Sequence, residues 1–166
     1  LEVREIFTGQ IMDLFREDVK QDGKALDALC FALQEGNTGE AERQLRKYLK
    51  RTISIRDTFA RKELKENFYH GILLGLLSNL DGWCVRSNAE SGDGYSDIMI
   101  EIEAQEIGIV IELKYAENAA FDAGCREALR QIREKKYEEA LVRDGMKIIY
   151  RYGIACYQKR CRVISG

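Results

Sequence analysis

Three residues whose side chains suit metal-dependent hydrolysis follow one another along the chain: Asp97, Glu112 and Lys114. Two converging carboxylates repel each other unless a cation lies between them, and hard divalent ions such as Mg²⁺ take oxygen ligands while keeping several waters. A bound ion lowers the pKa of a coordinated water and stabilises charge on a phosphate. A neighbouring lysine can act on that water or neutralise the developing charge. The set therefore suits hydrolysis of phosphodiesters.

A strand face that is exposed to solvent and carries an ion pair between strands would show the same three residue types. The segment from Ile107 to Ile111, just before Glu112-Leu113-Lys114, is continuously apolar. A solvated strand face would instead alternate polar and apolar residues. This context favours the metal site over the ion pair.

A hairpin is expected to bring the three side chains together. A turn at residues 104–107, taken as the symmetric centre of the hairpin, pairs Asp97 with Lys114 and Met99 with Glu112. Directly opposed residues share a face of the ribbon, as do residues two apart on one strand. All three side chains are therefore expected on one face, and a one-residue slip in register would separate them.

The rest of the chain predicts helices followed by a sheet. Apolar residues recur at helical spacing through the first 80 residues and then alternate with period two. Helices are expected over residues 3–19, 24–33, 40–50 and 61–80; strands over 83–89, 95–103 and 108–115; then a helix over 121–141 and strands over 147–157 and 161–164. This order predicts an α/β fold with a mixed sheet.

The length of 166 residues suits one domain with a small helical appendage. We expect an N-terminal helical segment over 1–60, either part of the same domain or a linker from an upstream module, and a core over 61–166. The chain begins at Leu1 and enters a helical pattern at once, so we expect it to be a fragment of a longer protein.

Composition narrows the class of protein. Hydrophobic residues make up 45% and charged residues 33%, as in soluble globular proteins, and no apolar run approaches the roughly 20 residues that span a bilayer. The five cysteines are odd in number and lack CxxC spacing, which favours reduced thiols in a cytoplasm. A single histidine, His70, excludes sites that need a histidine cluster, which includes most catalytic zinc sites.

Charge is distributed unevenly around a net value of −2. Residues 121–166 hold 11 Lys and Arg against 6 Asp and Glu, whereas residues 1–120 hold 15 against 22. A basic C-terminal third beside an acidic remainder is compatible with a surface that faces phosphates next to a carboxylate cluster. Ordinary surface variation is the alternative.

Arginines follow one stripe of the helix expected over 121–141. Arg126, Arg130 and Arg133 are spaced four and three apart. If this stripe flanks the metal site, the arginines are candidates for nucleic-acid binding, with Arg126 and Arg130 holding phosphates on either side of the reacting one. The alternative is a solvated helix face in which arginines pair with Glu127 and Glu134.

The order of motifs resembles a known family. Glu66 on a helix, the loop Gly92-Asp93-Gly94, Asp97, a hairpin and then Glu112-Leu113-Lys114 are similar to the motifs of the PD-(D/E)XK nuclease superfamily, with Ser96 in place of the proline. The chain looks most like the subfamily at the C-terminal end of bacterial and archaeal AAA-ATPase-like proteins. The resemblance implies a restriction-endonuclease-like core, a mixed sheet flanked by helices, after an N-terminal helical segment.

The resemblance also implies roles for individual residues. Asp97 and Glu112 would be ligands of Mg²⁺ or Mn²⁺, and Lys114 would be the catalytic lysine. The Leu113 carbonyl would be a further ligand, and Glu66 the helical acidic residue that some members use, often through a water.

Gln131 and Tyr137 are similar to the Gln…Tyr motif that supports the site in RecB-like members. For Glu66 and Gln131 the alternative is a solvated helix residue, and for Tyr137 it is a place in the core.

The implied function is a metal-dependent nuclease that acts on DNA, with RNA left open. Its partners would be nucleic acid and an upstream AAA-ATPase-like domain. The alternative is a nuclease-fold module that does not cut but binds nucleic acid or a protein partner for the attached ATPase. Oligomeric state stays open.

Overall fold

The computed structural model describes residues 23–53, 62–78, 80–88 and 97–166. The expected helix over 3–19 and the glycine loop before Asp97 lie outside the described residues.

Five α-helices and five strands are described, with two short 3-10 helices. The α-helices are α2 (Gly23–Gln34), α3 (Thr38–Thr52), α4 (Lys62–Leu77), α5 (Phe121–Lys135) and α6 (Tyr137–Arg143), which are numbered from α2. The strands are β1 (Cys84–Asn88), β2 (Asp97–Ile102), β3 (Ile107–Tyr115), β4 (Ile148–Tyr157) and β5 (Arg160–Ser165). The 3-10 helices are η2 (Glu103–Gln105) and η3 (Glu117–Ala119).

The five strands form one mixed sheet in the order β1-β2-β3-β4-β5. Only the central pair, β3 and β4, is parallel; the other neighbours are antiparallel. A parallel pair needs a long crossover, and α5 and α6 supply it. The expected α/β fold, a mixed sheet flanked by helices in the restriction-endonuclease-like manner, is confirmed.

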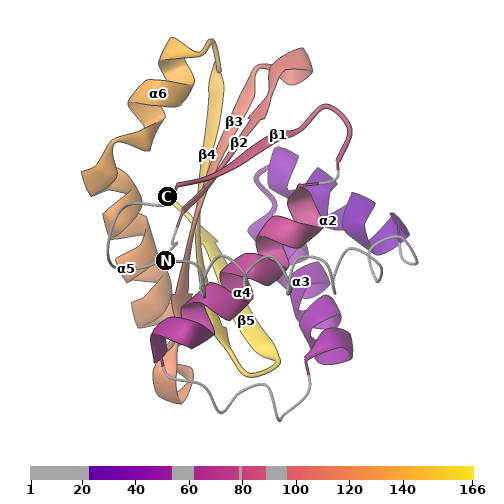
Figure 1. Ribbon diagram of the computed structural model, residues 1–166, viewed down its shortest axis with the longest axis vertical. Coiled ribbons are helices and arrows are strands. Elements are labelled where there is room, and N and C mark those ends of the chain that lie inside the picture. The colour runs from indigo at the N-terminus through magenta and orange to yellow at the C-terminus, as the bar shows by residue number, and fades with distance from the viewer. Residues whose placement is uncertain (1–22, 54–61, 79, 89–96) are drawn as a thin grey trace, which may run out of the picture.

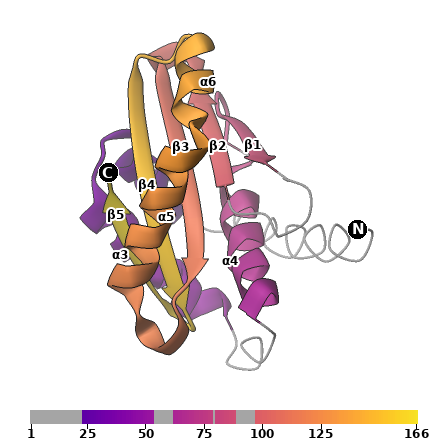
Figure 2. The ribbon, with the colours of Figure 1, turned by 90° about the vertical axis from the view of Figure 1, so that its left-hand side faces the viewer.

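Helices cover both faces of the sheet. Figures 1 and 2 show α5 and α6 on one face and α2, α3 and α4 on the other. One continuous buried cluster joins α2, α3 and α4 to the sheet, and a smaller one lies under α5 and α6. The fully buried Tyr152 of β4 donates its hydroxyl to the Leu33 carbonyl of α2 at 2.6 Å. The backbone N–H of Val163 in β5 donates to Glu42 of α3 at 3.1 Å. The described N-terminal helices therefore share a core with the strands.

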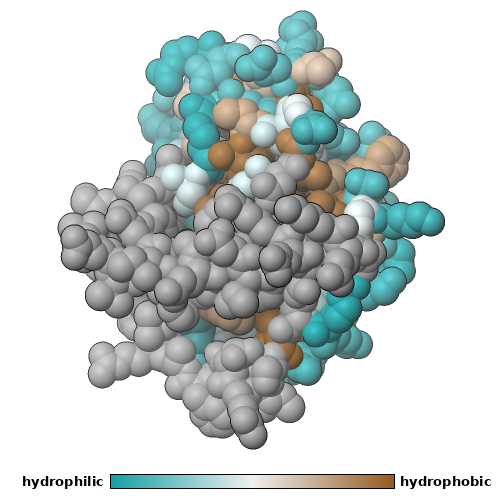
Figure 3. Space-filling model, turned by 45° about the vertical axis from the view of Figure 1, so that its right-hand side comes forward, coloured by the Kyte–Doolittle hydropathy of each residue, from teal (hydrophilic) through white to brown (hydrophobic). Residues whose placement is uncertain are grey.

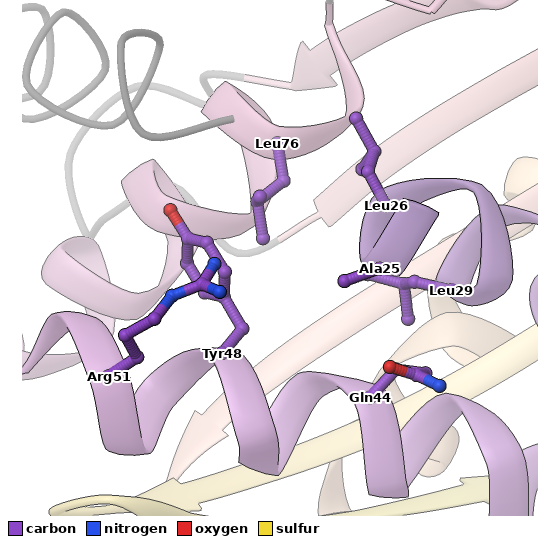
Figure 4. Close-up of a pocket in the computed structure, with 7 residues that line it drawn as sticks. All are labelled: Ala25, Leu26, Leu29, Gln44, Tyr48, Arg51 and Leu76. Carbon is purple, nitrogen blue, oxygen red and sulfur yellow. The ribbon is translucent and has the colours of Figure 1, made fainter. Parts of the chain in front are cut away.

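The junction of α2, α3 and α4 leaves a small pocket, drawn in Figure 4. Its lining is mainly apolar, with Gln44, Tyr48 and Arg51 of α3 along one side. In Figure 3, which brings the right-hand side of Figure 1 forward, visible hydrophobic residues gather mainly in the upper half, with hydrophilic ones around them.

The expected single helix over 121–141 is wrong, because it is two helices. Lys136 adopts a left-handed conformation (φ 53°) between α5 and α6. The change of direction lets Tyr137 and the fully buried Leu141 pack with Val110 over the first half of β3. Tyr137 thus belongs to the core. No glycine or proline marks the break, so burial of α6 outweighs the cost of a left-handed lysine.

No helix in the described ranges has the length and apolar character to cross a membrane.

Candidate active site

The pairing of β2 with β3 sets the positions of the candidate residues. Asp97 lies opposite Glu112, and Met99 lies opposite Val110. The expected pairing of Asp97 with Lys114 is therefore wrong by two residues, because the turn comes one residue earlier, through η2 and the left-handed Glu106 (φ 56°). A shift by two preserves the alternation of faces. The positions of Asp97, Glu112 and Lys114 still share one face; for Asp97 only the backbone is described.

Isoleucines on the opposite face hold this register. Ile98, Ile100 and Ile102 of β2 are at most 3% exposed and pack into the large cluster with Ile109 and Ile111 of β3. A one-residue slip would turn all three isoleucines of β2 away from that core. The register is therefore fixed by burial.

Glu112 is a carboxylate in the interior, with 0% exposure. It follows Val110 on the α5 face, where Val110 packs with Leu129 and Ile132. The ammonium nitrogen of Lys114, whose side chain is 14% exposed, lies 2.8 Å from Glu112 Oε1. Within the described part of the chain, Oε2 accepts no hydrogen bond. A buried charge is costly unless it is paired or bound to a metal, so this oxygen fits a cation ligand.

Close packing brings α5 against the strands that carry the site. Gly153 of β4 pairs with Glu112, and a Cβ at Gly153 would lie 2.5 Å from the Cys125 carbonyl oxygen of α5. Only glycine permits this approach. A Cβ at Gly124 would lie 3.7 Å from the Lys114 Cβ, so the first turn of α5 runs directly beside the lysine.

Gln131 lies on the same stripe of α5 as Gly124, the residue that passes beside Lys114. It follows Gly124 by seven residues, two helical turns, and Glu127 lies between them on the same stripe. Gln131 donates its amide to Glu127 Oε1 at 3.3 Å. Hydrogen bonds from Arg130, with smaller contributions from Gln131 and the nearby Lys114 charge, hold the pKa of the Glu127 carboxyl below its usual range.

Glu127 was not expected at the site. The signal in the sequence is its spacing of four from Gln131, but the same residue also has an arginine three positions later. The sequence therefore suggests an ordinary surface ion pair equally well.

Glu66 of α4 contacts the end of β3. Its Oε1 accepts a hydrogen bond from the Tyr115 backbone N–H at 3.2 Å. Backbone groups of alternate residues along a strand point to the same edge, so the Leu113 carbonyl points to the edge that Tyr115 uses. The described pairing with β2 ends at Glu112. Glu66 and the Leu113 carbonyl therefore face the same edge of β3, just beyond the described pairing with β2 and next to Glu112.

The three arginines of α5 are exposed. Arg130 is engaged by both Glu127 and Glu134, which is the expected alternative of a paired helix face. Arg126 is four residues after Asp122, which pairs with Arg162 of β5 at 3.0 Å. Arg126 and Arg133 therefore lie on the β5 side of the helix, whereas Gln131 lies on the stripe of Gly124 and Glu127.

His70 is packed inside the protein. It is 1% exposed, and its Nε2 lies 2.9 Å from Ser87 Oγ of β1. Burial lowers the pKa of His70 to about 4, so the imidazole is neutral near pH 7.

Neither histidine nor cysteine builds a metal site in the described structure. Its side chains, which exclude that of Asp97, form no group of three or more His, Cys, Asp or Glu that could hold an ion.

Comparison with protein families identifies the chain. The family description "PD-(D/E)XK nuclease superfamily" matches residues 64–166, which include α4 from its third residue on, all five described strands and every candidate site residue. The chain belongs to this superfamily. Neither the curated proteins nor the solved structures contain a significant match.

Proposed function

We propose that this protein is a metal-dependent nuclease that hydrolyses phosphodiester bonds of DNA. The observation that carries the proposal is Glu112: a fully buried carboxylate with Lys114 at one oxygen, no hydrogen bond to the other within the described structure, and the Asp97 position directly opposite. A structural ion pair needs no second carboxylate beside it. A divalent cation does, because it takes several oxygen ligands.

The donor set fits Mg²⁺ or Mn²⁺. Asp97, Glu112 and the Leu113 carbonyl would hold the ion, and Glu66 would reach it through a water. When bound, the ion acidifies water and neutralises charge on the reacting phosphate. Glu66 also accepts the Tyr115 N–H, which fixes its carboxylate at the edge of β3.

Lys114 would act on the reacting groups. A charged lysine has three donors and no lone pair, so it is not a metal ligand. Its contact with buried Glu112 holds the ammonium on the face of the sheet that carries the site. From there it would donate to the attacking water or to a phosphate oxygen and stabilise the charge that develops.

Gln131 and Glu127 would position Lys114 from the side of α5. Gly124 brings the helix beside the lysine, and the amide of Gln131 orients the Glu127 carboxylate on the same stripe. The Glu127 carboxylate would attract the Lys114 ammonium without removing it from Glu112.

The finer assignments belong to the same proposal. We propose DNA as the substrate and the cytoplasm as the location of the protein. We also propose an upstream AAA-ATPase-like domain as a partner, as in the subfamily that the motif order resembles. A non-cutting module would also bind nucleic acid, so cleavage distinguishes the two functions.

The test is cleavage of supercoiled plasmid, single-stranded DNA and RNA with Mg²⁺ or Mn²⁺. We expect cleavage of at least one DNA substrate that requires the ion and stops in EDTA. Asp97→Asn, purified in parallel, controls for contaminating nucleases and should be inactive. Binding of nucleic acid by the wild type, with no cleavage in either ion, would establish the non-cutting alternative.

Contacts from α5 to the nucleic-acid backbone form a separate prediction. Replacing Arg126 and Arg130 with glutamate should weaken binding of unrelated sequences alike, because phosphate contacts carry no base information. The salt dependence of binding should also become flatter. Fluorescence anisotropy over a salt series measures both. If the salt dependence of binding is unchanged, the nucleic acid binds elsewhere, and Lys159, Arg160 and Arg162 become the candidate contacts.

A further inference from the structure

Cations and aromatic rings meet at one end of the sheet, next to the proposed site. Lys65 of α4, Tyr115 of β3, Tyr157 of β4, Arg160 of β5 and Phe121 of α5 form what is here called the cation–aromatic strip. Figures 1 and 2 show that the end of β3, the β4–β5 hairpin and the start of α5 lie together at the lower end of the sheet.

Successive contacts make the strip continuous. Lys65 Nζ lies 4.7 Å from the centre of the Tyr115 ring and donates to its hydroxyl at 3.2 Å. The Tyr115 and Tyr157 ring centres are 5.7 Å apart. Tyr157 pairs with Arg160 across the hairpin. The Arg160 guanidinium lies 5.3 Å from the centre of the Phe121 ring.

The strip crosses the end of the sheet from one face to the other. Tyr157 packs against the large cluster on the α4 side and also against the Ala116, Cys125 and Ala155 cluster on the α5 side. Phe121 packs against the second of these. Tyr69 fixes the hairpin by donating its hydroxyl to the Gln158 carbonyl at 2.7 Å. The rings are therefore held on a rigid support.

The exposed rings and the positive charges of the cation–aromatic strip suit a nucleic acid, which has flat bases and a negatively charged backbone. Tyr157 and Phe121 are partly exposed and Arg160 is exposed, whereas Tyr115 is buried beneath them. The nearby acid Asp122 is already paired with Arg162, and Glu117 of η3 is exposed.

We propose that the cation–aromatic strip binds single-stranded nucleic acid and leads it to Lys114, an inference that rests on the proposed nuclease function. Tyr157 and Phe121 stack on bases, and Lys65 and Arg160 contact phosphates. Stacking on aromatic side chains is available only to unpaired bases, whereas phosphate contacts alone would serve a duplex equally well. The strip therefore selects single strands, including frayed ends.

The test measures binding in EDTA, which prevents cleavage. The probes are labelled oligothymidylate, labelled oligouridylate and a labelled DNA duplex. The double variant Phe121→Leu and Tyr157→Leu keeps apolar bulk in the cluster but removes both ring faces. We expect its affinity for oligothymidylate to fall about tenfold or more, with duplex affinity nearly unchanged. Phe31→Leu, which alters a phenylalanine of α2 that is 65% exposed, is the matched control and should bind like wild type.

Arg160→Glu is the second variant, because an exposed arginine can be replaced without loss of core. It should weaken oligothymidylate binding as well. Comparing the affinities for oligouridylate and oligothymidylate shows whether the protein prefers single-stranded RNA or single-stranded DNA. Wild-type protein that binds duplex as tightly as single strands, or a double variant that retains its affinity, would overturn the inference.

The outcomes separate this inference from the proposed function. Strip-dependent binding of single strands without cleavage in Mg²⁺ or Mn²⁺ would overturn the nuclease function alone. Metal-dependent cleavage with normal binding by the strip variants would overturn the inference alone.

Discussion

Lys114→Ala should reduce metal-dependent cleavage by about 10²–10³-fold, the usual loss when one pre-organised donor to the developing charge is removed. The ammonium lies 2.8 Å from Glu112 Oε1 and is held on the face that carries the Asp97 position. Because lysine is not a ligand, metal binding should persist, and removing a competing cation from Glu112 should not weaken it. Single-turnover cleavage rates and the thermal shift with Mn²⁺ measure the two quantities separately.

Lys147→Ala is the matched control for this variant. Lys147 also pairs with a glutamate, Glu106, at 2.7 Å, but both are exposed and lie at the opposite end of β3. An exposed pair contributes about 0–1 kcal/mol, so this variant should cleave at the wild-type rate. Equal cleavage by Lys114→Ala and wild type would place the activity elsewhere.

Saturating Mn²⁺ should raise the melting temperature of the wild type by about 5–10 °C. An ion at 100 times its Kd stabilises the folded state by about 2.7 kcal/mol, and each kcal/mol is about 2–4 °C for a domain of this size. The physical source is Glu112, whose buried charge lacks a second partner within the described structure. Calorimetry with and without the ion measures the shift.

Asp97→Asn and Glu112→Gln should each abolish the rise. Glu106→Gln removes a carboxylate from the exposed end of the same hairpin and should leave it unchanged. If all four proteins respond alike, the ion binds outside the site; if none responds to any divalent ion, the site is vestigial.

The sequence predicts most of this architecture, because the spacing of apolar residues reflects which side chains are buried. Burial of those side chains in turn stabilises the helices and the sheet. The strands that carry the candidate residues were predicted to within two residues at each end. Their shared face was also predicted, because a register error of two residues leaves alternation intact.

Other features depend on contacts between distant segments. The left-handed Lys136 follows from packing of α6 on β3, and the Glu66 contact from α4 reaching the end of β3. The closeness of α5 to Lys114 depends on Gly153, forty-one positions from Glu112 in sequence but its direct partner in the sheet. No pattern of neighbouring residues in the sequence predicts these contacts.

The isoleucines of β2 also bear on how this protein can change by mutation. A slip that disrupts the alignment of Asp97 with Glu112 would also expose Ile98, Ile100 and Ile102. At about 1.5–3 kcal/mol for each side chain, that loss approaches the whole stability of a typical domain, about 5–15 kcal/mol. Selection for folding alone therefore preserves the alignment, even in a lineage that has ceased to use it. A descendant could lose Lys114 and still keep Asp97 aligned with Glu112. A single substitution back to lysine could then restore the complete set of site residues.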